Sequence, residues 1–211
     1  MRPYPQAHRA VGVFAVLVVV WAAAAAAAVA PAAPPAAPSS PALDAAPQAL
    51  AAELAKLGQP GPFHEYLKAY VGTWKTTTTL TVDPRLPPTV TTGHTLKRMI
   101  LGGRFLKEEL TGEMMGMPFN GFGITGFNNT TRKFETIWLD SMGTMIMTGS
   151  GEGENGTCTV LMDFVDPMSK QKMTAKGVTK VVDANKHVYT MYLMVGGKDM
   201  KTMEAEYIRK K

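Results

Sequence analysis

The sequence contains a single cysteine, Cys158, among its 211 residues. One cysteine cannot form an intrachain disulfide, so the fold must be stabilised by its core alone. No cysteine stands directly after the apolar segment near the N-terminus, which excludes a lipoprotein anchored through a lipid-modified cysteine. Cys158 itself lies in the middle of an apolar segment without a nearby base, where we expect a buried and unreactive thiol.

The patterns that identify common catalytic and nucleotide-binding sites are also absent from the sequence. There is no Gly-x-Ser-x-Gly turn to carry a serine nucleophile and no phosphate-binding Gly-Lys-Ser/Thr loop. Beyond residue 60 the histidines are His64, His94 and His187, and none has a second ligand at the spacing that zinc requires. We therefore predict no metal centre and no cofactor.

Clustered charge is a third feature that the chain lacks. Charged residues make up 18% of the sequence and give a formal net charge of +5, but they are scattered. The longest basic run is Arg209-Lys210-Lys211 at the C-terminus. Because nucleic acid is bound by basic side chains gathered on one face or stripe, the scatter argues against a nucleic-acid partner.

Residues 1–30 have the parts of a secretory signal. A basic head with Arg2 and Arg9 precedes an apolar run over residues 11–30, which ends in alanines that suit cleavage. The same run, at about 20 residues, is long enough to span a bilayer if it stays uncleaved. We therefore expect a periplasmic or secreted protein, with anchoring in the inner membrane through residues 11–30 as the alternative.

The rest of the chain divides into a linker and one domain. Residues 31–60 consist mostly of alanine and proline, a composition that cannot bury a core. We expect a disordered linker there, with a helical turn or two over Ala49–Leu57. The remaining residues, 61–211, are enough for one domain with a proper core and no more.

The folded part shows almost no helical periodicity beyond residue 70. Short segments rich in Thr, Val, Tyr, Phe and Met are separated by Gly, Pro, Asn and Asp, a spacing typical of an all-β sandwich or barrel. A short helix over Phe63–Tyr70 should precede the first strand. Short joints between about ten strands predict antiparallel neighbours, and a single up-and-down β-barrel closes such a meander without a free edge.

The positions of Gly, Pro, Asn and Asp predict where each strand begins and ends. A loop rich in Met and Gly is expected over Gly112–Pro118, and Gly121, Gly123 and Gly126 predict bends or bulges at a barrel corner. The predicted strands are Thr73–Val82, Thr89–Ile100, Arg104–Thr111, Phe119–Phe127, Lys133–Asp140, Thr144–Gly149, Thr157–Val165, Lys170–Val182, His187–Val195 and Lys201–Lys210.

Gly72-Thr73-Trp74 stands at the start of the first predicted strand, directly after the predicted helix. It resembles the Gly-x-Trp motif of lipocalins and their calycin relatives, in which the tryptophan packs at the closed end of the barrel. The resemblance implies that a cationic side chain from the last strand lies over the indole, and Arg209 is in that region. Gly72, Trp74 and Arg209 are therefore predicted to be structural residues.

Several blocks of the folded part are similar, in the same order, to one uncharacterised bacterial family, domain of unknown function 1579. These blocks are Leu101–Phe105, Gly116–Asn128, Trp138–Thr144 and Glu204–Lys210. The resemblance extends over nearly the whole folded part and implies a lipocalin-like barrel. It implies no activity, because the family has no agreed one.

Four side chains are candidates for ligand binding: Trp74, Arg104, Trp138 and Asp140. Arg104 follows a Gly-Gly turn and would project into the barrel mouth or lumen. Asp140 ends a strand beside Trp138, where it would pair with the indole or bind the polar end of a ligand. Both polar residues also have a structural interpretation. Arg104 would form a partly buried ion pair, and Asp140 would cap the turn at residues 141–143.

Methionine is unusually frequent, with fifteen in the chain and all but the initiator between Met99 and Met203. Flexible thioethers fill apolar pockets that accept varied shapes, which is the interpretation that we favour. Thioethers also suit Cu(I), so a copper site is an alternative. Since some haem-binding calycins use a single histidine as the protein ligand, His187 leaves haem as a further alternative.

These patterns together predict a non-enzymatic binding module that holds a small apolar or amphipathic molecule in the barrel lumen. One alternative is an enzyme that uses a lumenal carboxylate, Asp140 or Glu204, as an acid or base. The other alternative is a structural or interaction barrel with a filled core. A structure without a cavity in the lumen would favour the barrel with a filled core over the binding module and the enzyme.

Overall fold

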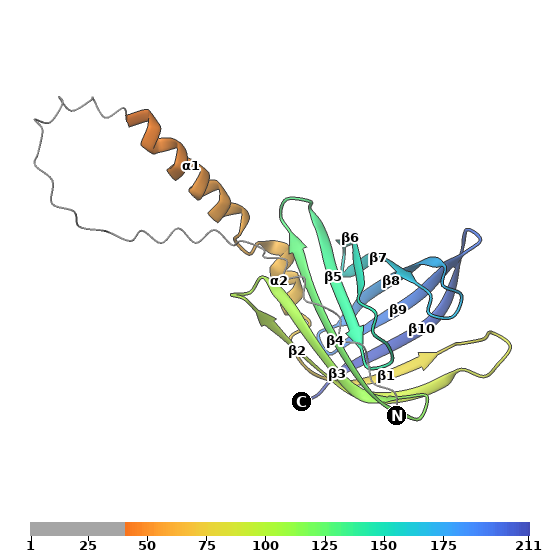
Figure 1. Ribbon diagram of the computed structural model, residues 1–211. Helices are drawn as coiled ribbons and strands as arrows, with labels where there is room; N and C mark the ends of the chain where they lie inside the picture. The colour runs from red at the N-terminus through yellow and green to blue at the C-terminus, as the bar shows by residue number, and fades with distance from the viewer. Residues whose placement is uncertain (1–40) are drawn as a thin grey trace, which may run out of the picture. The chain divides into compact units, whose positions relative to one another are not determined.

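The computed structural model describes residues 41–211, with side chains from Pro47 onward. Ten antiparallel strands form a closed barrel in which each pairs with its neighbours in sequence, and β1 pairs with β10 (Figure 1). This arrangement confirms the predicted up-and-down β-barrel. The elements are α1 (Pro41–Leu57), α2 (Pro62–Lys68), β1 (Gly72–Leu80), β2 (Thr89–Ile100), β3 (Phe105–Met114), β4 (Met117–Asn128), β5 (Lys133–Asp140), β6 (Met147–Glu154), β7 (Thr157–Val165), β8 (Lys172–Asp183), β9 (Lys186–Val195) and β10 (Lys198–Arg209).

Helix α1 is longer than the turn or two predicted over Ala49–Leu57. Alanine has the highest helix propensity, and in this segment it outweighs the one proline inside the helix, Pro47. The described side chains of α1 are exposed. Residues 1–40, which include the predicted signal and the first part of the predicted linker, lie outside the described residues. In the part of the chain that the structure describes, neither helix has the length and apolar character of a bilayer span.

The hairpin between β3 and β4 is tighter than predicted. In place of a loop over Gly112–Pro118, β3 continues to Met114 and β4 begins at Met117. Only Met115 and Gly116 connect the two strands, and both have positive φ angles, 54° and 79°. Two successive positive φ angles are the conformation of a two-residue hairpin turn. The prediction was wrong because methionine is not a residue that signals this turn.

Strand β6 lies further along the chain than predicted. It spans Met147–Glu154 in place of the predicted Thr144–Gly149, and residues 141–146 connect it with β5. The strand is rich in glycine because β7 approaches it closely: a Cβ at Gly151 would overlap the backbone of Thr159. Glycine is depleted in strands generally, which is why the sequence pattern placed this strand too early.

Three glycines of β4 make room for aromatic rings and introduce no β-bulge. Bends or bulges were predicted at Gly121, Gly123 and Gly126, but β4 pairs with both of its neighbours without a register shift. A Cβ at Gly121 or Gly123 would meet the ring of Trp138, and one at Gly126 would meet the ring of Phe105. The absent side chains therefore leave space on the sheet for these two rings.

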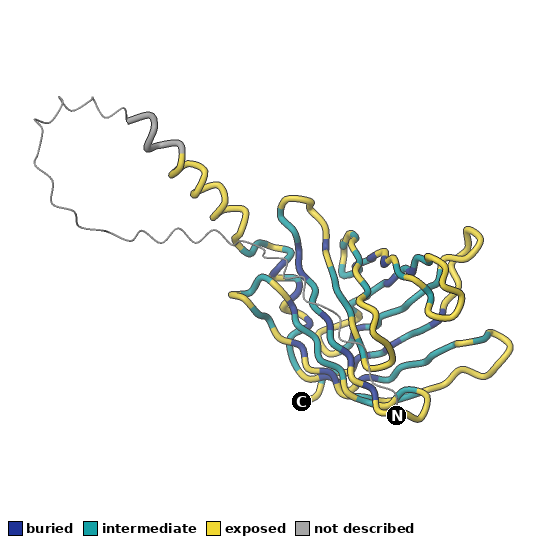
Figure 2. Tube along the Cα trace, in the orientation of Figure 1, coloured by how far each residue is buried: buried dark blue, intermediate teal, exposed yellow. Residues whose placement is uncertain are grey.

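Helix α2 covers one end of the barrel, which we call the closed end (Figure 1). Leu67 and the following Tyr70 are buried there and join the main core with Phe127 and Phe134. Phe63 at the start of α2 stacks on Phe127, with ring centroids 4.1 Å apart. The loop tips are largely exposed, whereas the buried residues lie in α2 and along the strands (Figure 2).

Trp74 and Arg209 join the first and last strands at the closed end. They are partners in the β1–β10 register, and the Arg209 guanidinium lies 4.1 Å from the centre of the indole. Trp74 is 1% exposed, and its Nε1 donates to the carbonyl of Tyr70 at 2.9 Å. A Cβ at Gly72, where φ is 137°, would meet the Arg209 guanidinium. Arg209 also donates to the carbonyls of Ala69, Val71 and Ala184.

We expect Arg209→Ala to lower the free energy of unfolding by about 3 kcal/mol, because it removes a cation from three carbonyls and from the indole. Urea denaturation would measure the change. Arg98→Ala is the matched control, since Arg98 has only an exposed ion pair with Glu109 and should cost less than about 1 kcal/mol. Equal losses in the two variants would contradict the role of Arg209 at the closed end.

Candidate functional site

The barrel encloses a cavity of about 340 Å³, which we call the lumen. This volume is near the lower end of the range of about 300–1,000 Å³ that is typical of small-molecule pockets. Away from the closed end the lining is largely apolar, and its methionines come from different strands and loops around the wall. These methionines are Met114, Met142, Met147, Met162, Met191 and Met203. Such a distribution fits the pocket lining that the sequence favoured.

Four polar side chains from four strands meet at the closed-end side of the lumen, and we call them the floor cluster. They are Lys97, Glu108, His187 and Tyr207. Lys97 Nζ lies 3.2 Å from the Glu108 carboxylate and 3.1 Å from His187 Nε2. The Tyr207 hydroxyl donates to the same carboxylate at 3.2 Å. The Tyr207 ring stacks on the imidazole of His187, with centroids 4.3 Å apart.

Burial determines the protonation of the floor cluster. Desolvation lowers the pKa of His187 to about 2, and the nearby Lys97 and Arg209 cations contribute to this lowering, so the imidazole is neutral. Burial also lowers the pKa of Lys97, against the opposite effect of the Glu108 carboxylate. Lys97 Nζ and His187 Nε2 lie within hydrogen-bonding distance of each other. His187 Nδ1 is buried and has no hydrogen-bond partner among the described residues.

This arrangement offers little to a metal ion. Among residues 41–211, no group of three or more His, Cys, Asp or Glu side chains is placed to hold one. Of the two ring nitrogens of His187, Nε2 faces the Lys97 ammonium and Nδ1 is fully buried. Neither nitrogen is therefore free to bind a haem iron. Cys158 lines the lumen as a thiol whose pKa burial raises to about 11, which keeps it protonated and unreactive.

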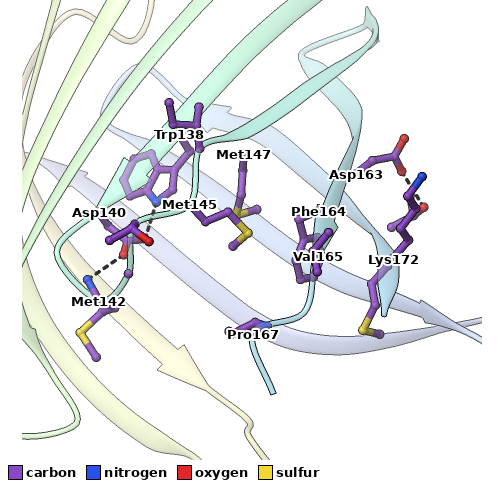
Figure 3. A pocket seen from close by; sticks show the side chains of 15 residues that line it. Trp138, Asp140, Met142, Met145, Met147, Asp163, Phe164, Val165, Pro167 and Lys172 are labelled. Atoms are coloured by element: carbon purple, nitrogen blue, oxygen red, sulfur yellow. Dashed lines mark hydrogen bonds between the residues drawn. The ribbon is translucent and has the colours of Figure 1, made fainter. Parts of the chain in front are cut away.

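A second and more open cavity, of about 1040 Å³, lies at the end of the barrel opposite α2, and we call it the rim cleft. Its walls are the end of β5, the loop over residues 141–146, the end of β7 and the start of β8 (Figure 3). Trp138, Asp140, Met142 and Met147 line the rim cleft and the lumen alike. The two cavities therefore adjoin each other at these side chains.

The structure brings two of the predicted ligand-binding residues, Trp138 and Asp140, together at this boundary (Figure 3). Trp138 Nε1 donates to Asp140 Oδ2 at 2.9 Å, while the backbone amide of Met142 donates to Oδ1 at 2.9 Å. Asp140 therefore orients the indole and caps the following turn. The predicted pairing with the indole and the predicted turn cap thus occur at the same carboxylate, while ligand binding by Asp140 stays a prediction.

The other two predicted ligand-binding residues, Trp74 and Arg104, line neither cavity. Trp74 lies behind the floor cluster, with its indole 4.4 Å from the imidazole of His187. Arg104 lies at the β2–β3 turn and donates to the carbonyls of Gly58 and Leu101. The prediction that Arg104 reaches the lumen was wrong because this turn is at the closed end of the barrel. The expected ion pair is replaced by hydrogen bonds to carbonyls.

Glu204, the second carboxylate of the enzyme hypothesis, is not in the lumen. It forms an ion pair with Lys201 at 2.7 Å, with both side chains nearly half exposed. The inward positions of β10 are taken by Ala205 and Tyr207, which line the lumen. Because successive side chains of a strand point to opposite faces, Glu204 lies on the outer face of the barrel.

The floor cluster is the part of the site that the sequence analysis missed. Lys97, Glu108 and Tyr207 were not singled out in the sequence, where Lys97 was counted only among the scattered charges. In β2, however, Lys97 has the same parity as Thr95, and the two residues are 5% and 0% exposed. A lysine in phase with buried residues is rarely left without a partner of opposite charge. The alternation of buried and exposed positions in β2 was therefore the sequence signal that could have identified Lys97 as a lumen residue.

The fold and its cavity define the class of protein: a ten-stranded up-and-down β-barrel with an internal pocket and a polar floor. Residues 59–209 match the family described as "Protein of unknown function (DUF1579)", and the chain belongs to that family. The sequence blocks had predicted this membership.

One solved structure supports the fold assignment. The crystal structure of Rv2717c from M. tuberculosis aligns with a TM-score of 0.51 at 15% identity, over 72% of this chain and 100% of that one. At this identity the similarity concerns the fold alone. A redesigned β-barrel aligns with a TM-score of 0.40 at 12% identity, over 69% of this chain and 96% of its own. No curated protein matches the sequence.

The neutral imidazole of His187 should make stability depend on pH. Its pKa is about 2 in the folded protein, against 6.5 for an exposed histidine, so between these values the unfolded chain binds the extra proton. We expect the free energy of unfolding to fall as the pH drops below about 6.5. The contribution of this residue is up to about 1.4 kcal/mol per pH unit.

Urea denaturation at pH 7.5 and pH 5.5 would test this expectation. His187→Gln should weaken the dependence on pH, because the variant has no imidazole to protonate. His94→Gln is the control, since His94 is exposed and its replacement should leave the dependence as it is. If His187→Gln lost as much stability at pH 5.5 as the unmodified protein, the His187 imidazole would not be the neutral group that we describe.

Proposed function

We propose that this chain is an exported binding protein that holds a small amphipathic molecule in the barrel lumen. The polar end of the ligand would lie on the floor cluster and its apolar part among the methionines. The observation that carries the proposal is a lumen of about 340 Å³ with apolar walls and buried polar groups at one end. Apolar cavities with a few fixed polar groups are the usual form of a small-molecule site.

The two alternatives have less support. A barrel with a filled core would leave no lumen of this size. In the enzyme hypothesis Asp140 is the carboxylate that lines the lumen, but both of its oxygens already accept hydrogen bonds, from Trp138 and Met142. A general base must be able to reach a proton of the substrate, so these hydrogen bonds would have to be exchanged first. Binding requires no such exchange.

Native mass spectrometry of the full-length protein, purified without denaturation, should reveal a stoichiometric additional mass that is lost on denaturation. We expect Trp138→Ala to weaken retention of this ligand at least tenfold, because it removes an aromatic wall shared by the lumen and the rim cleft. Losing the apolar contact of one such side chain costs roughly 1.5–3 kcal/mol, and about 1.4 kcal/mol is a factor of ten in affinity.

Arg104→Ala is the matched control, because Arg104 lines neither cavity and its replacement should leave the bound mass unchanged. Equal retention in Trp138→Ala and in the unmodified protein would place the ligand outside the lumen. A protein that carries no additional mass and gains none from added amphiphiles would contradict the binding function itself.

A further inference from the structure

The charges that line the lumen are mostly carboxylates. Among the described residues, the lining contains one cationic side chain, Lys97, and three carboxylates, Glu108, Glu113 and Asp140. The single cation is therefore the group to which an anionic ligand would have to bind. Whether it is available for such a ligand depends on its contacts in the floor cluster.

Lys97 is already occupied by the protein's own groups. Its Nζ lies 3.2 Å from the Glu108 carboxylate, with the two side chains 6% and 19% exposed. It also lies 4.1 Å from the centre of the Tyr207 ring and 3.1 Å from His187 Nε2. A ligand carboxylate that took Lys97 would leave Glu108 unpaired in a dry environment, where an isolated charge is very costly.

A cationic ligand is opposed by the same pair. Glu108 accepts from Tyr207 and is paired with Lys97, so an incoming ammonium would have to displace a buried lysine. The two other carboxylates lie toward the open end, where Glu113 is exposed and Asp140 orients Trp138. The buried end of the lumen therefore has paired charges and no net charge to offer.

Uncharged hydrogen-bonding groups, in contrast, are plentiful around the lumen. Threonine hydroxyls line it on several strands, and each can donate and accept. These threonines include Thr76, Thr78, Thr125, Thr136 and Thr179. Thr76 pairs with Thr95 at 2.7 Å, which leaves one hydroxyl of that pair free to donate. Thr125 pairs with Thr136 at 3.1 Å, and Thr136 also donates to the carbonyl of Ile124, so this pair keeps acceptor capacity. Such groups suit a hydroxyl, carbonyl or amide.

We propose that the lumen selects amphipathic molecules whose buried polar end is uncharged, such as an alcohol or an amide, over carboxylates and amines of the same chain. This inference rests on the proposed function, since it specifies the ligand class of the same lumen. Its physical basis is the paired state of Lys97 and Glu108: a neutral polar group leaves the pair intact, whereas either charge must break it.

The test is calorimetric titration of the full-length protein at pH 7.5 with decanol, decanoate and decylamine, which differ only in the polar end. We expect decanol to bind at least about tenfold more tightly than either charged probe, because a buried charge without a partner costs several kcal/mol. Tighter binding of decanoate or decylamine would overturn this inference and leave the binding function standing. Binding of none of the three would overturn both.

A change of charge at the floor should change the preference. Glu108→Gln leaves Lys97 without its counter-ion, so decanoate should gain at least tenfold relative to decanol. Glu109→Gln is the matched control: this neighbouring glutamate pairs with Arg98 and Lys107 on the outer face, and its replacement should retain the original order. An unchanged preference in Glu108→Gln would overturn the inference.

A second variant keeps the test informative if Glu108→Gln does not fold. The double substitution Lys97→Met and Glu108→Gln removes both charges, and replacing a buried pair by neutral groups of similar size is often tolerated. This variant should still prefer decanol over decanoate and decylamine. If it binds a charged probe more tightly than decanol, the uncharged character of the floor is not what selects the ligand.

Discussion

The Arg209 guanidinium lies over the indole of Trp74 at 4.1 Å, and the imidazole of His187 meets the same ring nearly at right angles at 4.4 Å. The first contact holds the last strand to β1, and the Arg209 hydrogen bonds to Ala69 and Val71 hold it to the segment that leads from α2 into β1. Through the second, the indole packs against the imidazole, which also stacks on the ring of Tyr207. The packing that closes the sheet therefore also buries the His187 side of the floor cluster.

Burial explains why the polar groups of the floor cluster are paired with one another. A buried ion pair repays its desolvation only when the remaining hydrogen-bonding capacity of both partners is satisfied. Here the Tyr207 hydroxyl and the neutral His187 ring complete the contacts of Glu108 and Lys97. The result is a lumen with a cluster of paired charges at its closed end and a wall of methionines, aromatic rings and threonines beyond it. In the proposed complex this difference would give an amphipathic ligand a preferred direction.

Sequence patterns predicted the fold well because turn residues separate the strands, and Gly72-Thr73-Trp74 indicated which end is closed. They failed where a residue serves a distant neighbour: Gly121 leaves room for Trp138, and Gly151 admits the β7 backbone. The pair Lys97 and Glu108 depends on register, since the two residues are direct cross-strand partners in β2 and β3. The pairing of Lys97 with Glu108 follows from the pairing of Ile100 with Phe105 across the turn. The sequence alone does not give the length of that turn, so it could not predict this register.

Because β6 begins only at Met147, the size of the proposed ligand is limited in one part and not in another. Pairing of β6 with β5 stops at Trp138, and pairing with β7 stops at Asp163, so the last residues of both neighbours have no strand between them. The barrel wall thus has a gap between the ends of β5 and β7, at the rim cleft and directly beside the lumen. In the proposed complex, a long ligand tail would leave sideways through this gap while its head stays in the lumen. The volume of the lumen would then limit the size of the ligand head and would not limit the length of its chain.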